Sequence, residues 1–398
     1  MSIKPLHIAD SIQEAGKRIA QQKVPTWYAC QGIQYPVRLS LEQCSSEDTA
    51  RYKATLVQGN SLVDLTGGMG VDCSFLSQSF THTTYVEQQE ELCNLARHNF
   101  ACLGKNITVI NAQCEDFLAE MWPVDVIFID PARRDNKGGK VALLGDCTPN
   151  LLEIGAMLLQ KCHTLLIKLS PMIDIESVLN VFHSTYEVHI VAVKNECKEV
   201  LVCVKGEWRD EKGERRDEKG SASSAVNEPH AAVPEPVEGP AGKEPCIICA
   251  NLPLYGKPFV FTRGAEATCM ATYSQPLTYL YEPNAAILKA GGFKQIAQQF
   301  GVCKLHSNSH LYTSDTCITH FPGRIFAIER VTKVQRKEIA DIDKANLSIR
   351  NFPGSVADLR KKLKLKDGGD VYVFATTLHD NSKVLIVGRK LGVTPLRG

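Results

Sequence analysis

Residues 64–72 of this 398-residue chain read DLTGGMGVD and have the composition of a turn that binds a ligand through its backbone. Glycine stands at three of four consecutive positions, Gly67, Gly68 and Gly70. Glycine tolerates positive φ angles and lets a ligand approach the backbone without meeting a Cβ atom. The apolar run before the turn predicts a strand, and a helix starting near Val71 would add unpaired N–H donors. The turn therefore indicates a nucleotide site, with a tight structural turn as the alternative.

Acidic residues follow the next two predicted strands. Glu87 ends the run TTYVE, seventeen residues beyond Gly70, where a carboxylate can accept hydrogen bonds from both hydroxyls of a ribose. Glu115 and Asp116 follow the run ITVINA, where an acidic side chain can meet an adenine amine. The alternatives are that Glu87 caps the next helix and that the other two are solvated charges at a helix start. Three successive strand ends thus predict a nucleoside pocket at the carboxyl edge of a parallel sheet.

Asp64 and Thr66 indicate which nucleoside this is. A dinucleotide site needs its glycine turn to hold a pyrophosphate, but here Thr66 occupies the first glycine place and Asp64 lies close to the turn. An acidic residue there favours a ligand with a cationic or amine group. S-adenosylmethionine (SAM) has an ammonium, a sulfonium and no phosphate, so we expect SAM as the cofactor.

The elements that would hold these residues alternate along residues 46–206. Five apolar runs are each followed by a helix-like stretch: SLVDL, TTYVE, ITVINA, VDVIFIDP and TLLIKLSP. Five strand–helix units predict a parallel sheet with helices on both faces. Two further β-rich runs, EVHIVAVKN and KEVLVCVKG, have no room for a helix between them and predict a terminal antiparallel hairpin. We therefore expect an α/β, doubly wound, Rossmann-like domain.

The fourth strand ends in Asp130-Pro131-Ala132-Arg133-Arg134, and here residues 46–206 resemble class I SAM-dependent methyltransferases. The glycine turn matches the family's first motif, Glu87 its second-strand acid, and Asp130-Pro131 the motif after strand four. The resemblance implies that this loop faces the transferred methyl group. Asp130 would then position or deprotonate the acceptor, Pro131 would offer its carbonyl, and Arg133 or Arg134 would hold a phosphate or orient the loop.

Two departures from the family pattern narrow the expected reaction. Ala132 replaces a second proline and Arg133 replaces the aromatic residue that commonly stacks on a base, so stacking at this loop is not expected. Some C5-methyltransferases use a cysteine nucleophile after the next strand, where this chain has Ser170. Serine cannot take over the addition of a thiolate to a pyrimidine ring. Transfer to nitrogen or oxygen is therefore favoured.

Composition divides the rest of the chain. Residues 46–206 have 13 Lys+Arg and 20 Asp+Glu, a net charge of −7, whereas residues 321–398 have 16 and 8, a net charge of +8. Residues 207–245 are charged, then rich in Pro and Glu, which predicts a disordered linker or insertion. Residues 1–45 predict a helical arm, with a helix near Ile8–Gln21 and irregular chain before a second helix capped by Ser45 or Ser46.

Two segments near the end resemble the THUMP-like domain of a little-characterised bacterial group of methyltransferases. They read FPGRIFAIERV and RNFPGSVADLRKKLKLKDGGDVYVFATT. The resemblance implies an α+β ferredoxin-like domain at residues 246–320 and a basic THUMP-like domain at residues 321–398. The pattern of residues 246–320 itself predicts short strands and one helix near Asn284–Phe300.

A basic helix beginning near Ser355 makes RNA the expected substrate. Val356, Leu359 and Leu363 would share one face, while much of the remainder is basic. Each basic side chain that reaches a phosphate adds salt-dependent affinity, and a solvated basic face is the alternative. The candidate RNA-binding residues are Arg360, Lys361, Lys362, Lys364 and Lys366.

Metal and membrane partners are not expected. The pair Cys246–Cys249 lacks the further ligands of a zinc site, and His306 and His310 lie in a stretch that reads as loop or strand. No apolar run approaches the roughly 20 residues of a membrane helix, and the first residues do not read as a secretory signal. We expect reduced cysteines and a cytoplasmic protein.

Three other functions are compatible with this pattern: an NAD-dependent oxidoreductase with the same glycine turn, an RNA-binding protein with a vestigial pocket, and a methyltransferase acting on protein or a small molecule. The acceptor atom and the oligomeric state do not follow from the sequence.

Overall fold

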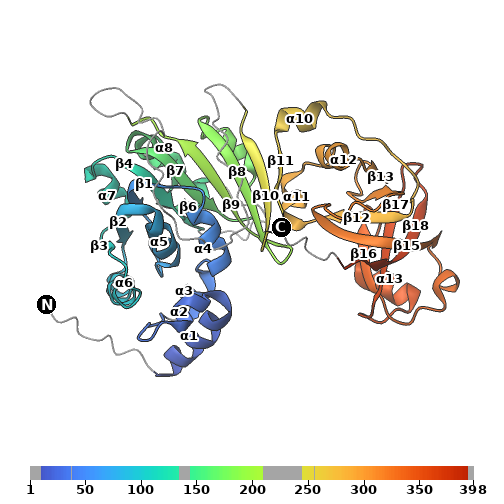
Figure 1. Cartoon of the computed structure of the whole chain (residues 1–398), viewed down its shortest axis with the longest axis horizontal. Coiled ribbons are helices and arrows are strands. Elements are labelled where there is room, and N and C mark those ends of the chain that lie inside the picture. The colour runs from blue at the N-terminus through green and yellow to red at the C-terminus, as the bar shows by residue number, and fades with distance from the viewer. Residues whose placement is uncertain (1–9, 37, 134–143, 209–243, 255, 393–398) are drawn as a thin grey trace. The chain divides into compact units, whose positions relative to one another are not determined.

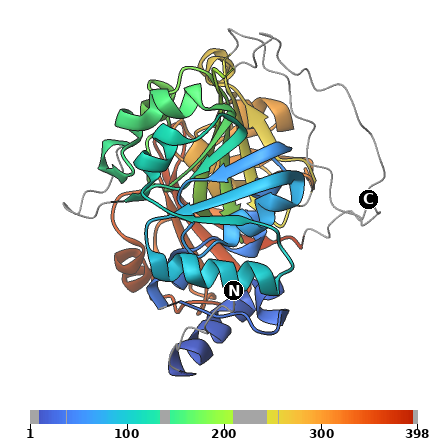
Figure 2. The same cartoon turned by 90° about the vertical axis from the view of Figure 1, so that its left-hand side faces the viewer.

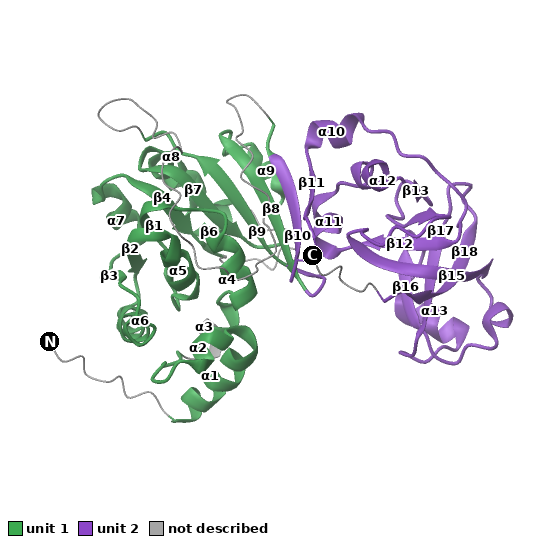
Figure 3. Cartoon of the chain, viewed as in Figure 1, with its two compact units in different colours: residues 1–193, 198–245 green, residues 194–197, 246–398 purple. Residues whose placement is uncertain are grey.

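A computed structural model describes residues 10–36, 38–133, 144–208, 244–254 and 256–392. The chain divides into unit 1, residues 1–193 and 198–245, and unit 2, residues 194–197 and 246–398 (Figure 3). No helix within the described ranges is both long and apolar enough to cross a membrane.

Unit 1 is built around a largely parallel sheet (Figure 1). Its strands are β1 (Gly59–Asp64), β2 (Phe80–Glu87), β3 (Thr108–Asn111), β4 (Val124–Ile129), β7 (Cys162–Leu169), β8 (Thr185–Val193) and β9 (Glu196–Lys205), with a separate pair, β5 (Ala132–Arg133) and β6 (Cys147–Thr148). The order within unit 1 is β8–β9–β7–β4–β1–β2–β3. Strands β3, β2, β1, β4 and β7 are parallel, and β9 is antiparallel to β7. The predicted doubly wound sheet with a terminal hairpin is confirmed.

Helices lie on both sides of this sheet (Figure 2). The helices that follow its strands are α5 (Val71–Leu76), α6 (Glu90–Cys102), α7 (Cys114–Glu120), α8 (Leu151–Gln160) and α9 (Ile175–Leu179). The strands between the two helical layers are buried, as the near-continuous apolar runs predict: Val126, Ile127 and Phe128 of β4 are almost fully inaccessible. The carboxyl ends of β1 and β4 meet where the chain reverses its direction of winding, which is where open α/β sheets bind ligands.

The N-terminal arm is more helical than its sequence predicts. It contains α1 (Asp10–Lys23), α2 (Pro25–Ala29), α3 (Arg38–Gln43) and α4 (Glu47–Ala54). The predicted irregular chain is thus two short helices, and Pro25 occupies the first turn of α2, a position that suits proline. Ser46 caps α4 as predicted, accepting a hydrogen bond from the N–H of Thr49.

The arm packs directly on the predicted cofactor turn. Trp27 and Leu41 belong to the same apolar cluster as Met69 of the turn and Val71 of α5. Trp27 Nε1 also donates a hydrogen bond of 3.3 Å to the hydroxyl of Ser74. The glycine turn is therefore supported by the arm as well as by its own sheet.

Unit 2 contains a second sheet with the order β13–β14–β12–β15–β18–β17–β16. Its strands are β12 (Tyr279–Pro283), β13 (Cys303–Lys304), β14 (Tyr312–Ser314), β15 (Gly323–Lys333), β16 (Asn346–Arg350), β17 (Val371–Thr377) and β18 (Lys383–Lys390). A hairpin of β10 (Cys246–Leu252) and β11 (Phe259–Phe261) precedes them. Because β12 pairs with β15, the predicted ferredoxin-like and THUMP-like segments share one sheet.

The helices of unit 2 are α10 (Arg263–Thr268), α11 (Ala285–Ala290), α12 (Gln295–Phe300) and α13 (Val356–Leu363). The prediction of a single helix near Asn284–Phe300 is wrong, because the first helix ends at Ala290 and a second begins at Gln295. Gly291 ends α11 in a left-handed conformation with φ of 86°, and a Cβ on Gly292 would lie 2.8 Å from the ring of Phe259. The chain turns at this glycine pair and starts α12.

Candidate active site

The glycine turn connects the end of β1 to α5. The N–H of Gly67 donates to the carbonyl of Val86 at 2.9 Å, which ties the turn to β2. A Cβ on Gly67 would lie 2.1 Å from the ring of Tyr85, so this glycine is required by packing. Gly70 is the N-cap of α5 with φ of 85°. A Cβ on Gly68, in contrast, would meet nothing closer than 3.8 Å, so the backbone of Gly68 can be approached by a ligand.

Asp64 lies at the end of β1 and is fully buried. Its Oδ1 accepts a hydrogen bond of 3.1 Å from the N–H of Thr66, but its Oδ2 has no hydrogen-bond partner among the described residues. Burial raises the pKa of Asp64 well above its usual value, and the nearby carboxylates of Asp72, Asp130 and Glu87 raise it further. A buried acidic oxygen without a partner is costly unless a donor or a cation reaches it. The unpartnered acceptor oxygen of Asp64 therefore fits a ligand with an ammonium group.

Glu87 lies at the end of β2 and is buried beside the glycine turn. Its Oε2 accepts a hydrogen bond of 3.0 Å from the N–H of Gly68, and its Oε1 accepts one of 2.8 Å from the N–H of Gln89. Gln89 is the N-cap of α6, so the predicted alternative of a helix-start contact is also present. Each carboxylate oxygen has a second lone pair, which leaves room for the predicted ribose contact.

Glu115 and Asp116 occupy the first turn of α7, directly after β3. Both side chains are exposed. Their position after β3 agrees with the sequence-based expectation, and an adenine contact by either side chain stays a prediction.

Asp130 follows β4, and its backbone is fixed by the glycine turn. The N–H of Asp130 donates a hydrogen bond of 2.6 Å to Oγ1 of Thr66. Thr66 in the first glycine place therefore has a structural role that its sequence position did not reveal: it connects the end of β1 to the end of β4. The predicted cofactor turn and the predicted catalytic loop are thereby joined.

Lys168, on β7, is a site residue that the sequence analysis missed. Its Nζ lies 2.5 Å from Oδ2 of Asp130 and 3.4 Å from Oδ2 of Asp72. Burial would lower the pKa of Lys168, but Asp130, Asp72 and Glu199 outweigh burial and raise it well above its usual value. Lys168 therefore stays charged and holds the side chain of Asp130 in place through this contact.

The ion pairs continue into the interior of unit 1. Asp72 Oδ1 lies 3.2 Å from Nζ of Lys53, and Asp72 Oδ2 accepts a hydrogen bond of 2.7 Å from Ser45. Lys53, fully buried on α4, donates to both carboxylate oxygens of Glu199 at 2.7 and 2.9 Å. Burial favours a raised pKa for Asp72, but the two lysines hold it below its usual value. An alternating chain of charges thus runs from Glu199 to Asp130.

Pro131 and Arg133 follow Asp130 in a short segment that the structure describes as far as residue 133. Ala132 pairs with Thr148 and Arg133 with Cys147, forming the β5–β6 ladder. This ladder fixes the backbone path just after Pro131. The side chain of Arg133 and the whole of Arg134 lie outside the described part, so their predicted roles stay predictions.

The predicted RNA-binding residues lie on or just after α13. Ser355 caps this helix through the N–H of Asp358, and Leu359 and Leu363 are buried as predicted. Val356, in the first turn of the same helix, is 39% exposed. Arg360 and Lys366 form ion pairs with aspartates, whereas the others have no ion-pair partner among the described residues: Lys361, Lys362 and Lys364.

The residues considered for a metal do not converge. Cys246 and Cys249 lie along β10, His306 Nδ1 accepts from the N–H of Asn308, and His310 stacks on Phe293. One group in the described ranges does bring ligand atoms together: Glu187, His189 and Cys203. Its histidine is already hydrogen-bonded at both ring nitrogens, to Tyr52 and Glu187.

Comparison with known proteins supports the same reading of both units. Two family models match unit 2: a ferredoxin-like domain over residues 279–322 and a THUMP domain-like model over residues 323–390. The chain is 33% identical to a crystal structure described as a "putative methyltransferase" from Porphyromonas gingivalis W83, with a TM-score of 0.80 over 97% of this chain and 92% of that one.

Similarity to curated proteins is more restricted. The chain is 29% identical over 140 residues to an uncharacterized S-adenosylmethionine-dependent methyltransferase of Mycobacterium tuberculosis, found in strains CDC 1551 and H37Rv. The match covers 35% of this chain and 37% of the length of that relative.

The sheet order, the glycine turn and the Asp130 loop define the class I SAM-dependent methyltransferase fold. With its similarity to the Porphyromonas protein over nearly the full length, the chain belongs to the family of such methyltransferases that have ferredoxin-like and THUMP-like C-terminal domains. This family assignment rules against the alternative of an NAD-dependent oxidoreductase.

Proposed function

We propose that this protein transfers a methyl group from SAM to a nitrogen or oxygen atom of RNA. The observation that supports it most strongly is the buried Asp64, whose Oδ2 lacks a partner at the carboxyl edge of the sheet. The ammonium of a methionine arm is the kind of group that would satisfy this oxygen.

The residues around the turn suit the rest of the cofactor. Asp64 would bind the ammonium, and the space beside the Gly68 backbone would allow close approach of the ligand. Glu87 would accept from the ribose hydroxyls, and Glu115 or Asp116 from the adenine amine. When bound, SAM supplies an electrophilic methyl group on its sulfonium.

Asp130 would position or deprotonate the acceptor. Its carboxylate lies 2.5 Å from the ammonium of Lys168, which fixes its position. Such a carboxylate can still accept a hydrogen bond from an amine or hydroxyl and so direct its lone pair. The carbonyl of Pro131 would provide a second acceptor, and Arg133 or Arg134 would hold a substrate phosphate or orient the loop.

RNA is the substrate that the charge distribution favours. Residues 321–398 have a net charge of +8, and Lys361, Lys362 and Lys364 are exposed. A polyanion would be attracted to such a surface. A methyltransferase acting on protein or a small molecule is the second candidate, and it gives no reason for this charge.

The proposal can be tested by incubating the protein with tritiated SAM and total RNA from a strain that lacks it, then separating the RNA by size class. We expect label in one class with the wild-type protein and little label with Asp130→Ala. In a parallel incubation with a whole extract of that strain, label in protein or small molecules and none in RNA would instead support the second candidate.

A further inference from the structure

In the THUMP-like segment most of the described arginines form ion pairs, whereas among the described lysines only Lys366 does so. Arg324 and Arg350 both bind the buried Glu282, with Arg350 Nη2 at 2.7 Å from its carboxylate. Arg330, Arg360 and Arg389 pair with Asp341, Asp367 and Glu329, respectively. The charges left for a partner are therefore mainly lysines, which bind phosphates as point charges.

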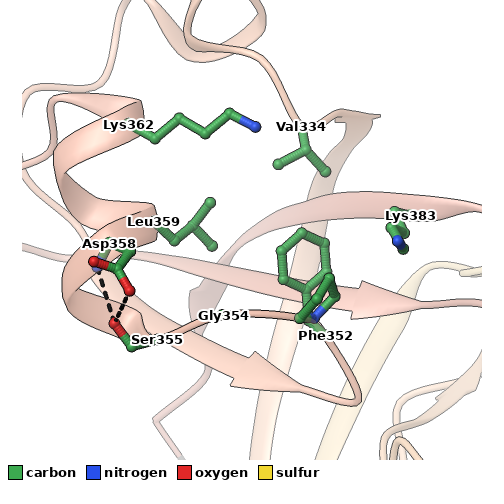
Figure 4. Close-up of a pocket in the computed structure, with 9 residues that line it drawn as sticks. Val334, Phe352, Gly354, Ser355, Asp358, Leu359, Lys362 and Lys383 are labelled. Carbon is green, nitrogen blue, oxygen red and sulfur yellow. Dashed lines mark hydrogen bonds between the residues drawn. The ribbon is translucent and has the colours of Figure 1, made fainter.

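Two of these lysines flank a pocket. Lys362, on α13, and Lys383, at the start of β18, line a hollow of about 380 Å³ (Figure 4). Neither lysine has an ion-pair partner in the described ranges. The volume lies at the lower end of the range of roughly 300–1,000 Å³ that is usual for small-molecule sites.

The floor between the lysines is apolar and contains an aromatic ring. Val334, Phe352 and Leu359 line it, and all three belong to or pack against the cluster under α13. Figure 4 shows Phe352 between Leu359 and Lys383, with the side chain of Lys362 extended from the helix toward Val334. Packing on one side holds the ring in place while leaving it partly exposed.

The turn before α13 shapes the pocket. Gly354 has φ of 93°, a left-handed conformation that lets the chain turn from Phe352 into the helix. Ser355 then caps the helix and donates a hydrogen bond of 2.6 Å from its hydroxyl to Asp358. The one acidic residue that lines the pocket is thus already bound at the helix start.

We propose that this pocket binds a single nucleotide of single-stranded RNA. The base would lie against Phe352 and Leu359, and the phosphates on either side would contact Lys362 and Lys383. An aromatic face between two cations matches the alternation of base and phosphate along a single strand. A paired base would not reach the ring, because the bases of an RNA duplex are stacked inside it. The sequence predicts only a basic helix here, whereas the fold adds the aromatic floor. This inference rests on the proposed function in taking RNA as the ligand.

The inference can be tested with the full chain and a fluorescein-labelled, single-stranded 12-nucleotide RNA, using fluorescence anisotropy. Phe352→Leu keeps the apolar floor but removes the aromatic face, and we expect it to weaken binding about tenfold, the equivalent of one lost stacking contact. Lys362→Gln with Lys383→Gln should weaken binding and lower the slope of log affinity against log salt by about 2.

A matched control removes the same charge elsewhere. Lys344 and Lys390 are exposed and do not line the pocket, so Lys344→Gln with Lys390→Gln should change the affinity much less than the pocket pair. Thermal unfolding of each variant excludes loss of fold as the cause. When 5-iodouridine is placed in the same RNA and irradiated, we expect the RNA to crosslink to the peptide that contains Phe352.

The proposal is overturned if Phe352→Leu binds as tightly as the wild type and crosslinks map elsewhere. Polyglutamate can be added as a competitor of the RNA. If it displaces the RNA equally well from the wild type and from Phe352→Leu, the pocket is a general polyanion surface and the proposal is also overturned. If the protein methylates RNA but the pocket variants bind the oligonucleotide as tightly as the wild type, the pocket proposal is wrong and the proposed function stands. If the oligonucleotide binds through Phe352 but no RNA is methylated, the proposed function fails instead.

Discussion

Lys168 on β7 and Asp130 after β4 form an ion pair with 2.5 Å between Nζ and Oδ2. The pair lies where the predicted catalytic loop leaves the sheet, and Lys168 is also 3.4 Å from Asp72. Asp130 is fixed at both ends, because its N–H binds Thr66. The geometry of the loop thus depends on a lysine that faces two acids.

Replacing Lys168 should therefore affect stability and activity together. Lys168→Met leaves the Asp130 and Asp72 carboxylates without this cation. Breaking a buried pair typically costs 3–5 kcal/mol, but Asp72 keeps Lys53 and Asp130 is partly exposed, so we expect a loss of about 2 kcal/mol in the free energy of unfolding. Urea denaturation measures this loss. Lys168→Arg should recover part of the stability and part of the methyl transfer. Full methyl-transfer activity in Lys168→Met would show that Lys168 has no role in the active site.

Asp64→Asn should have opposite effects on the free and the cofactor-bound protein. In the free protein, burial and three neighbouring acids raise the pKa of Asp64 above its usual 3.8. The folded chain then retains a proton that the unfolded chain has released, so this group makes stability fall as pH rises from 3.8 toward the raised pKa. The neutral amide should remove that loss and make the free protein more stable at neutral pH.

Cofactor binding should weaken in the same Asp64→Asn variant. A lost hydrogen bond to a charged group is worth roughly 1.5–3 kcal/mol, which predicts at least a tenfold lower affinity for S-adenosylhomocysteine by calorimetry. Equal affinity in the two proteins would show that Asp64 does not meet the ammonium.

Two glycines of the turn should behave differently when changed to alanine. The methyl group of Gly67→Ala would overlap the Tyr85 ring at 2.1 Å, so we expect an overpacking cost of about 3 kcal/mol. Gly68→Ala meets open space and carries only the strain of its positive φ, about 1 kcal/mol. Thermal unfolding separates the two variants. If S-adenosylhomocysteine binds along the Gly68 backbone, Gly68→Ala should fold yet lose affinity; unchanged affinity would contradict that contact.

Local patterns were enough to predict the sheet of unit 1. Apolar runs alternating with helix-like stretches implied parallel strands, and acids at strand ends placed Asp64, Glu87 and Asp130 at one edge. The short helices α2 and α3 were missed because each is held mainly by packing, as with Trp27 and Leu41 against Met69. Packing of this kind leaves little trace in local periodicity.

The charge network could not be predicted, because its members are distant in sequence. Lys53 and Glu199 are 146 positions apart, and Lys168 and Asp130 are 38 apart. One signal was available: Lys168 interrupts the otherwise apolar run TLLIKLSP, and a lysine in a buried strand requires a partner. The identity of that partner follows only from the fold.

The central claim, that this site methylates nitrogen or oxygen in RNA, is tested most directly by mass spectrometry of nucleosides. RNA from a strain lacking the protein would be incubated with the wild-type protein or Asp130→Ala and SAM that carries a deuterated methyl group. We predict one nucleoside with the deuterated methyl on nitrogen or oxygen, formed by the wild type and nearly absent with the variant. A deuterated methyl on carbon, or no labelled nucleoside in any RNA, would contradict the claim.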